Sequence, residues 1–157
     1  QKLAGILHPG SFSMLGVGVS FALAAKLAHP DGNAIVISGD GAFLSGGLSI
    51  EAAFQENLPI TVIIDNNGGL TTISQQQERL FESGQHVAAD FRDIPFHTMF
   101  EGLGGYGELV ERPEDIAPAI GRAIASGKTA CVNVRTRGVI SPIVAAVTSR
   151  RDKASIE

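Results

Sequence analysis

The sequence lacks the features that mark disulfide-linked, membrane-spanning and nucleic-acid-binding proteins. It has one cysteine, Cys131, so no internal disulfide can form, and a reducing cytoplasm is the expected location. No apolar run approaches the roughly 20 residues that a membrane-spanning helix needs, so we expect no membrane partner. Acidic residues outnumber basic residues by 16 to 12, and the net charge of −4 argues against a nucleic-acid partner.

The sequence has instead the apolar, glycine-rich composition of a folded domain. Of its 157 residues, 44% are hydrophobic and only 18% are charged, a balance that argues against intrinsic disorder. The 19 glycines indicate tight loops and close backbone packing. A chain of this length fits one domain with a sizeable core. Because it begins with Gln1 and is domain-like from Ile6, we expect a fragment, a processed chain or a small subunit.

Short apolar strands alternate with helices along the chain. The β-branched runs at 34–38 and 60–65 lie between turn residues and predict buried strands. The expected strands are 34–38, 60–65, 107–111 and 129–135, and the expected helices run from Ser11 or Ser13 to about Ala28, over 48–56, over 93–103, and from Pro113 to just before Gly127. This alternation predicts an α/β fold, a doubly wound and mostly parallel sheet with helices on both faces, which binds ligands at the carboxyl ends of its strands.

Two polar loops follow two successive strands of this predicted sheet. A Gly-Asp-Gly triplet, residues 39–41, follows the first strand, and Asn-Asn-Gly-Gly, residues 66–69, follows the second, with 24 residues between the triplet and the first asparagine. Either loop alone is a common turn signal, but together they bring the Asp40 carboxylate and the Asn67 amide oxygen to one edge of the sheet. Magnesium prefers about six oxygen ligands, usually shared with phosphates. The two loops therefore predict a magnesium site that holds a phosphate group.

The same spacing resembles the binding signature for thiamine diphosphate (ThDP), which is GDG followed by 24 residues and NN. The stretches SMLGVGVSFALAAKLAHP (13–30) and ISGDGAFLSGGLSIEAAFQENLPITVIIDNNGG (37–69) are similar to the acetolactate-synthase-like family. That family includes acetolactate synthases, 2-hydroxyacyl-CoA lyases and oxalyl-CoA decarboxylases. The resemblance identifies residues 1–140 as a ThDP diphosphate-binding domain and residues 141–157 as a C-terminal tail, a candidate lid over the active site.

The resemblance implies a set of contacts to the diphosphate end of ThDP. The side chains of Asp40 and Asn67 and the carbonyl of Gly69 would bind Mg²⁺. Backbone N–H groups near the strand ends would face the diphosphate, as in other phosphate-binding loops. The residues expected against the diphosphate are Gly39, Gly41, Ala42 and Leu70.

The resemblance also implies contacts to the aminopyrimidine ring, from the segment Ser13-Met14-Leu15-Gly16. Leu15 would be the apolar wedge that keeps ThDP bent, and the Ser13 carbonyl would accept a hydrogen bond from the 4′-amino group. Acetolactate synthases usually have methionine at the wedge, so Leu15 departs from the pattern, and Met14 takes the role if the register shifts by one. Gly16 and Gly18 equally suit close packing of a helix on the sheet.

In function, the chain resembles the diphosphate-binding and Mg²⁺-binding domain of a ThDP enzyme that makes or breaks a carbon–carbon bond next to a carbonyl. The implied activity is that of a 2-hydroxyacyl-CoA lyase or an acetolactate-synthase-like carboligase, acting on a small 2-oxo or 2-hydroxy acid or an acyl-CoA. An oxalyl-CoA-type or 2-oxo-acid decarboxylase is the alternative. A regulatory subunit that keeps the fold but does no chemistry is a further alternative.

We expect no catalytic residue in this chain. In the family, a glutamate on a separate pyrimidine-binding domain activates the cofactor, and the acids Glu51, Glu56 and Glu78 are better explained as surface residues of helices or loops. The chain should therefore be inactive without a pyrimidine-binding domain, supplied by its own missing N-terminal part or by a partner chain. The family forms its sites between protomers, so a homo-oligomer, a dimer or a tetramer, is expected.

Several segments have two interpretations. Arg150 and Arg151 are either part of a solvated tail or a contact for the phosphates of coenzyme A. The polar run 71–79 is either a surface loop or a segment that orders over bound cofactor, and His97 is expected on a helix surface. A dinucleotide-binding fold would need G-x-G-x-x-G directly after a strand, which the glycines at 16 and 18 do not provide.

Overall fold

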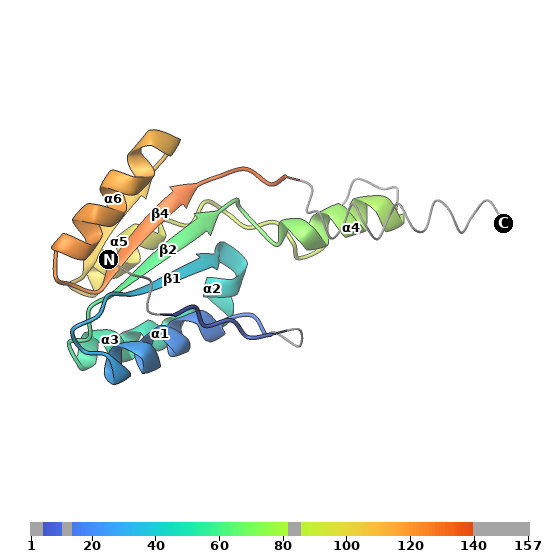
Figure 1. Cartoon of the computed structure of the whole chain (residues 1–157). Coiled ribbons are helices and arrows are strands. Elements are labelled where there is room, and N and C mark those ends of the chain that lie inside the picture. Colours follow the sequence, from blue (N-terminus) through green and yellow to red (C-terminus); the bar gives the residue numbers. More distant parts are fainter. Residues whose placement is uncertain (1–4, 11–13, 82–85, 140–157) are drawn as a thin grey trace. The chain divides into compact units, whose positions relative to one another are not determined.

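The computed structural model describes residues 5–10, 14–81 and 86–139 (Figure 1). These residues fall into two compact units. The first unit comprises the described residues within 1–66 and 95–135, and the second comprises those within 67–94 and 136–157. The first unit contains α1 (Val17–Ala28), β1 (Ala34–Gly39), α2 (Asp40–Gly46), the 3₁₀ helix η1 (Gly47–Ile50), α3 (Glu51–Gln55), β2 (Ile60–Asn66), α5 (Phe96–Gly102), β3 (Tyr106–Val110), α6 (Pro113–Ala125) and β4 (Ala130–Arg135). The second unit contains α4 (Thr71–Phe81).

The first unit is organised around one parallel sheet. Its strands lie in the order β1-β2-β4-β3, and every neighbouring pair is parallel. Each strand agrees with the expected one to within one residue at either end. The agreement follows for β1 and β2 from β-branched runs bounded by turn residues. The predicted α/β class, a doubly wound parallel sheet with flanking helices, is confirmed.

Helix α6 packs on one face of the sheet, over β2, β3 and β4. Its residues Ala119 and Ala123 are completely buried and pack with Ala130 and Val132 of β4. Small alanines let the helix backbone lie close to the sheet, and the β-branched residues of β4 fill the remaining space. Helix α6 and helix α1 lie on opposite sides of the strands (Figure 1).

The other face of the sheet is covered by α1, α2, α3 and α5. Phe43 of α2 contacts the rings of Phe96 and Phe100 of α5, with ring centroids 5.6 and 6.0 Å apart. Phe43, Phe96 and Phe100 are almost fully buried, so they form the apolar centre of this layer. Cys131, the second residue of β4, is fully buried. Burial in apolar surroundings raises the pKa of the Cys131 thiol, so it stays protonated.

Helix α1 is a packed helix of a globular domain, as expected for this apolar stretch. The Lys26 side chain lies 8% exposed, and its Nζ donates to the carbonyls of Pro30 and Gly32 at 2.7 and 2.8 Å. These bonds satisfy the ammonium group and close the turn after the helix. Among the residues that the structure describes, no helix is both long and apolar enough to cross a membrane.

The predicted start of α1 is wrong. The N-cap is Gly16, with a positive φ of 95°, and no side chain caps the helix; the serines expected to cap it, Ser11 and Ser13, lie outside the described residues. A Cβ on Gly16 would lie 2.8 Å from the backbone nitrogen of Gly46 in α2. Gly18 packs on the sheet, since a Cβ there would lie 3.1 Å from the Val36 side chain. Gly16 therefore permits contact between two helix backbones, and Gly18 the predicted contact with the sheet.

Two segments are helical where the sequence predicts a glycine loop or leaves the structure open. The sequence predicts a glycine loop before a helix at 48–56. Residues 40–47 instead form α2 and the start of η1, so helical structure begins directly at Asp40. The polar run 71–79 lies within α4. Its sequence TTISQQQERLF is mostly polar, with Ile73, Leu80 and Phe81 as its apolar residues, and only Ser74 of this helix is buried. The tail 141–157, with Arg150 and Arg151, lies outside the described residues.

Candidate functional site

In the first unit, the candidate site begins where β1 and β2 end. Gly39 and Asp65 are register partners at the carboxyl ends of these neighbouring strands. Asp40 therefore follows one strand directly, and Asn66 ends the other. Asn67 is the next residue along the chain after Asn66. This arrangement is the strand-end placement that the two loops in the sequence predict.

Asp40 is a buried carboxylate at the first position of α2. It is only 2% exposed, and its Oδ1 accepts a hydrogen bond of 2.7 Å from the Gly41 N–H. Carboxylates are rarely buried unless they are paired or bind a metal, so the burial indicates a specific role. Gly41 and Ala42 lie in the first turn of the helix, where backbone N–H groups have no acceptor within the helix.

A buried polar network lies beside these strand ends, and sequence reasoning missed it. The Asn66 side-chain amide donates to Oδ1 of Asn133 in β4 at 3.1 Å. Nδ2 of Asn133 lies 3.3 Å from Nδ1 of His97 in α5. His97 was expected on a helix surface; it is instead half-buried and faces this network. The network fixes the residue that immediately precedes Asn67, and no local pattern could reveal it because Asn66 and Asn133 lie 67 residues apart in sequence.

In the second unit, Asn67 is oriented by the helix that follows it. The Thr71 hydroxyl, at the start of α4, donates to Oδ1 of Asn67 at 2.9 Å. A carboxamide oxygen has two acceptor sites, so this bond leaves capacity for a cation. The backbone between them turns through Gly68 and Gly69, with positive φ values of 81° and 157°. A Cβ on Gly69 would overlap the carbonyl oxygen of Ala89, so only glycine fits there.

Residues 68–70 pair with residues 89–91 as a short antiparallel ladder. The Leu70 N–H donates to the Ala89 carbonyl at 2.7 Å, and the Phe91 N–H donates to the Gly68 carbonyl at 2.8 Å. Gly69 lies opposite Asp90 in the bridge between them. The N–H of Leu70, which the family resemblance assigns to the diphosphate, thus has a backbone acceptor here. Binding at Leu70 requires that bond to be exchanged for one to the diphosphate.

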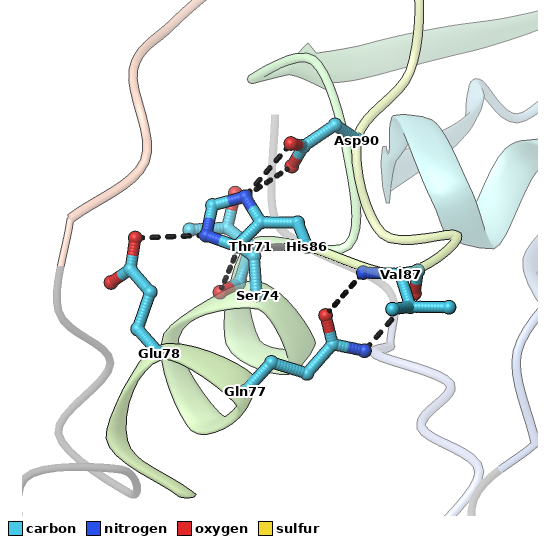
Figure 2. Close-up of polar contacts among 7 residues, drawn as sticks. All are labelled: Thr71, Ser74, Gln77, Glu78, His86, Val87 and Asp90. Carbon is cyan, nitrogen blue, oxygen red and sulfur yellow. Dashed lines mark hydrogen bonds and ion pairs between the residues drawn. The ribbon is translucent and has the colours of Figure 1, made fainter. Parts of the chain in front are cut away.

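Three side chains of the second unit form an ionic group, here called the His86 cluster: Glu78, His86 and Asp90. Figure 2 shows the His86 ring between the two carboxylates, with Nε2 at 2.8 Å from Glu78 and Nδ1 at 2.8 and 3.0 Å from the Asp90 oxygens. Two hydrogen bonds raise the pKa of His86 above its ordinary value, and the bond to Asp90 contributes more than the bond to Glu78. Glu78 is exposed, as expected for a surface residue, but no sequence pattern identifies His86 as its partner.

The aminopyrimidine segment is described only in part. Ser13 lies outside the described residues, whereas Met14 and Leu15 are 71% and 57% exposed. Leu15 immediately precedes the contact of Gly16 with Gly46. Leu44, two residues before Gly46, and Leu48, two residues after it, are also exposed, at 44% and 75%.

The other acidic residues fit the surface roles expected for them. Glu51 and Glu56, at the two ends of α3, are exposed. Within the described ranges, no cluster of three or more His, Cys, Asp or Glu side chains could hold a metal ion. The predicted magnesium ligands are one carboxylate, one carboxamide and one carbonyl, so they are of a different kind from such a cluster. Those donors are oxygens, and they suit magnesium.

The fold is that of α/β domains with a parallel sheet, a class that typically binds ligands at the carboxyl ends of its strands. Residues 1–134 match the family described as "Thiamine pyrophosphate enzyme, C-terminal TPP binding domain", thiamine pyrophosphate being another name for ThDP. The chain belongs to this family. The predicted family and its cofactor, ThDP, are thereby confirmed, and the dinucleotide-binding alternative is not supported.

Curated relatives include proteins of two activities. The chain is 39% identical over 131 residues to acetolactate synthase large subunit IlvG of Mycobacterium tuberculosis (strain ATCC 25618 / H37Rv), a match that covers 83% of this chain and 24% of that protein. It is 29% identical over 154 residues to 2-hydroxyacyl-CoA lyase of Oryza sativa subsp. japonica, covering 92% and 25%. It is 36% identical over 109 residues to 2-hydroxyacyl-CoA lyase 2 of Bos taurus, covering 69% and 17%. The chain spans a quarter or less of the length of these relatives.

Proposed function

We propose that this domain holds the diphosphate of ThDP through a magnesium ion bound by Asp40, Asn67 and Gly69. The observation that carries the proposal is the buried Asp40 carboxylate at the end of β1, beside the strand whose next residue is Asn67. Two side-chain oxygens and the Gly69 carbonyl leave about three of six positions for diphosphate oxygens and water. The lack of space for a side chain at Gly69 supports a backbone ligand there.

The backbone after β1 forms the second part of the proposed diphosphate site. Gly39 and Gly41 leave room for phosphate oxygens, and the N–H of Ala42 lies in the first turn of α2. The N–H of Gly41 donates to Oδ1 of Asp40, so it contributes to the site after that bond is exchanged for one to the diphosphate. Leu70 contributes its N–H after the bond to Ala89 is exchanged. The backbone N–H groups would donate hydrogen bonds to the diphosphate, and the bound Mg²⁺ would offset part of its negative charge.

The aminopyrimidine contacts require a second domain. We assign Leu15 as the wedge under the bent cofactor and the Ser13 carbonyl as an acceptor for the 4′-amino group. The exposure of Met14, Leu15 and Leu48 supports an apolar partner surface at this place. A pyrimidine-binding domain, from the same protein or from another protomer of a homo-oligomeric dimer or tetramer, would cover these side chains and contribute the activating glutamate.

The proposed reaction makes or breaks a carbon–carbon bond next to a carbonyl. When bound, ThDP supplies the electron sink for such reactions, while the protein binds and orients it. The relatives named above, an acetolactate synthase and two 2-hydroxyacyl-CoA lyases, support a lyase or carboligase acting on a small 2-oxo or 2-hydroxy acid or an acyl-CoA. This domain's own part is to hold the diphosphate, orient the cofactor and exclude water from it.

The test of the proposal is Mg²⁺-dependent binding of ThDP to the full chain, measured by titration calorimetry with and without a pyrimidine-binding domain. Asp40→Ala should lose the Mg²⁺-dependent part of the affinity while circular dichroism shows the fold retained. Asp31→Ala is the matched control, because Asp31 is an exposed acid near the opposite end of the same strand. If Asp40→Ala and Asp31→Ala both bind as the parent does, the proposed ligand is wrong.

A further inference from the structure

The ladder that carries Gly69 is held in place by α4 through side chains. Gln77 of α4 pairs with the backbone of Val87 in both directions, accepting from its N–H at 2.8 Å and donating to its carbonyl at 3.0 Å (Figure 2). The next residue of α4, Glu78, binds His86. These contacts fix residues 86 and 87, which lead directly into the ladder at residues 89–91.

The backbone between these contacts and the ladder has an unfavourable conformation. Ala88 has a φ of 55°, a left-handed conformation that non-glycine residues rarely adopt. Such a conformation persists only where the surrounding contacts determine it. The Gln77–Val87 pair lies on one side of Ala88, and the His86–Asp90 ion pair spans it by joining the residues two before and two after. The geometry of the ladder therefore depends on these contacts.

The contacts of His86 require a specific ionisation state. Both ring nitrogens face a carboxylate, Nδ1 towards Asp90 and Nε2 towards Glu78. A neutral imidazole has one donor and one acceptor nitrogen, so only the imidazolium can donate to both. Within the described part of the chain, these two carboxylates are the charged groups that act on His86.

We propose that His86 is a positioning residue for the cofactor: as an imidazolium it joins α4 to Asp90 and so holds Gly69 and Leu70 in the geometry that binds magnesium and diphosphate. The inference rests on the proposed function of Gly69 and Leu70. His86 does not touch the cofactor in this account; it acts through the ladder between residues 68–70 and 89–91. Loss of the His86 proton would remove one of the two donors and loosen the ladder.

The direction of the pH effect follows from the raised pKa of His86. A group whose pKa is higher in the folded state stabilises that state fully below its unfolded value of 6.5, and this contribution is lost as the pH rises through the folded-state pKa. The hydrogen bonds of the ladder should therefore be stable in mildly acidic solution and weaken as the pH rises above 6.5, the ordinary pKa of histidine. Because ThDP has its own ionisations, the effect must be measured against a variant that lacks the imidazole.

The experiment compares Mg²⁺-dependent ThDP affinity of the full chain at about pH 6 and about pH 9, on either side of an ordinary or raised histidine pKa. His86→Gln removes the ionisation, and His86→Lys keeps a positive charge across this range. At the lower pH, His86→Gln should bind about threefold to fivefold more weakly than the parent, the size expected for exposed ion pairs. At the higher pH the parent should fall to the level of His86→Gln, while His86→Lys should not. Equal affinity of the parent and His86→Gln at both pH values would overturn the inference.

A second measurement needs no cofactor. Amide hydrogen exchange of Leu70 and Phe91, whose N–H groups form the ladder, should be faster in His86→Gln than in the parent at about pH 6, after correction for the intrinsic rate. Identical protection in the two proteins would contradict the positioning role. The two proposals can be distinguished by comparing the variants. If Asp40→Ala loses Mg²⁺-dependent binding while His86→Gln matches the parent, only the inference about His86 is wrong.

Discussion

The Thr71 hydroxyl donates a hydrogen bond of 2.9 Å to the side-chain oxygen of Asn67. The oxygen that we propose as a magnesium ligand is thus oriented by the first residue of α4. The Ser74 hydroxyl in turn donates to the Thr71 carbonyl at 3.0 Å. A ligand oxygen held in place before the cation arrives loses less conformational entropy on binding. Thr71 is therefore a supporting residue of the proposed site.

Replacing Thr71 by valine removes the hydroxyl and keeps the branched shape. Thr71→Val should weaken Mg²⁺-dependent ThDP binding about threefold to tenfold, the value of one hydrogen bond. Thr71→Ser, which keeps the hydroxyl, is the matched control and should bind almost as the parent does. The measurement is titration calorimetry at fixed Mg²⁺, and an unchanged affinity for Thr71→Val would show that the hydroxyl does not orient Asn67.

A methyl group at Gly69 should disrupt the ladder. The added Cβ would overlap the Ala89 carbonyl oxygen, and the backbone must move to relieve the clash. Gly68→Ala is the matched control, because Gly68 also has a positive φ but a Cβ there meets nothing within 4 Å. We expect Gly69→Ala to bind ThDP about tenfold more weakly than Gly68→Ala, in line with the cost of overpacking. Equal binding of the two variants would mean that the close approach at Gly69 has no role.

Removing the amide of Asn133 should destabilise the first unit. Asn133 is 1% exposed, accepts from Asn66 and lies within hydrogen-bonding distance of His97. Asn133→Ala removes these partners and leaves a small void, so urea unfolding should show a loss of about 2–4 kcal/mol. A loss below about 0.5 kcal/mol, typical of a surface position, would contradict the role of the network.

The strands and the strand-end residues could be predicted from sequence because their signals are local. Runs such as AIVIS and ITVIID between turn residues specify buried strands, and the spacing of the two polar loops places Asp40 and Asn67 after neighbouring strands. The glycines of α2 predict a loop because glycine is also a common turn residue. The close packing of Gly46 against Gly16 shows why glycine is suited to this helix.

Other parts of the site depend on contacts that no local pattern encodes. His86 meets Glu78 of α4 and Asp90 of the ladder, and Asn66 meets Asn133 from a distant strand. Each of these side chains has an ordinary surface or strand position in the sequence, and its partner is determined only when the chain folds. Helix α4 was not predicted because most of its residues are polar, and its three apolar residues, Ile73, Leu80 and Phe81, are too few to distinguish a helix from a polar loop.

The most direct measurement is a crystal structure of the chain with its pyrimidine-binding domain, ThDP and Mn²⁺ in place of Mg²⁺, with anomalous scattering used to locate the metal. We predict an anomalous peak about 2.1–2.2 Å from the side-chain oxygens of Asp40 and Asn67 and from the carbonyl oxygen of Gly69. This is the distance between a small divalent cation and its oxygen ligands. A diphosphate bound with its metal elsewhere, or with Asp40 and Asn67 directed away from each other, would contradict it.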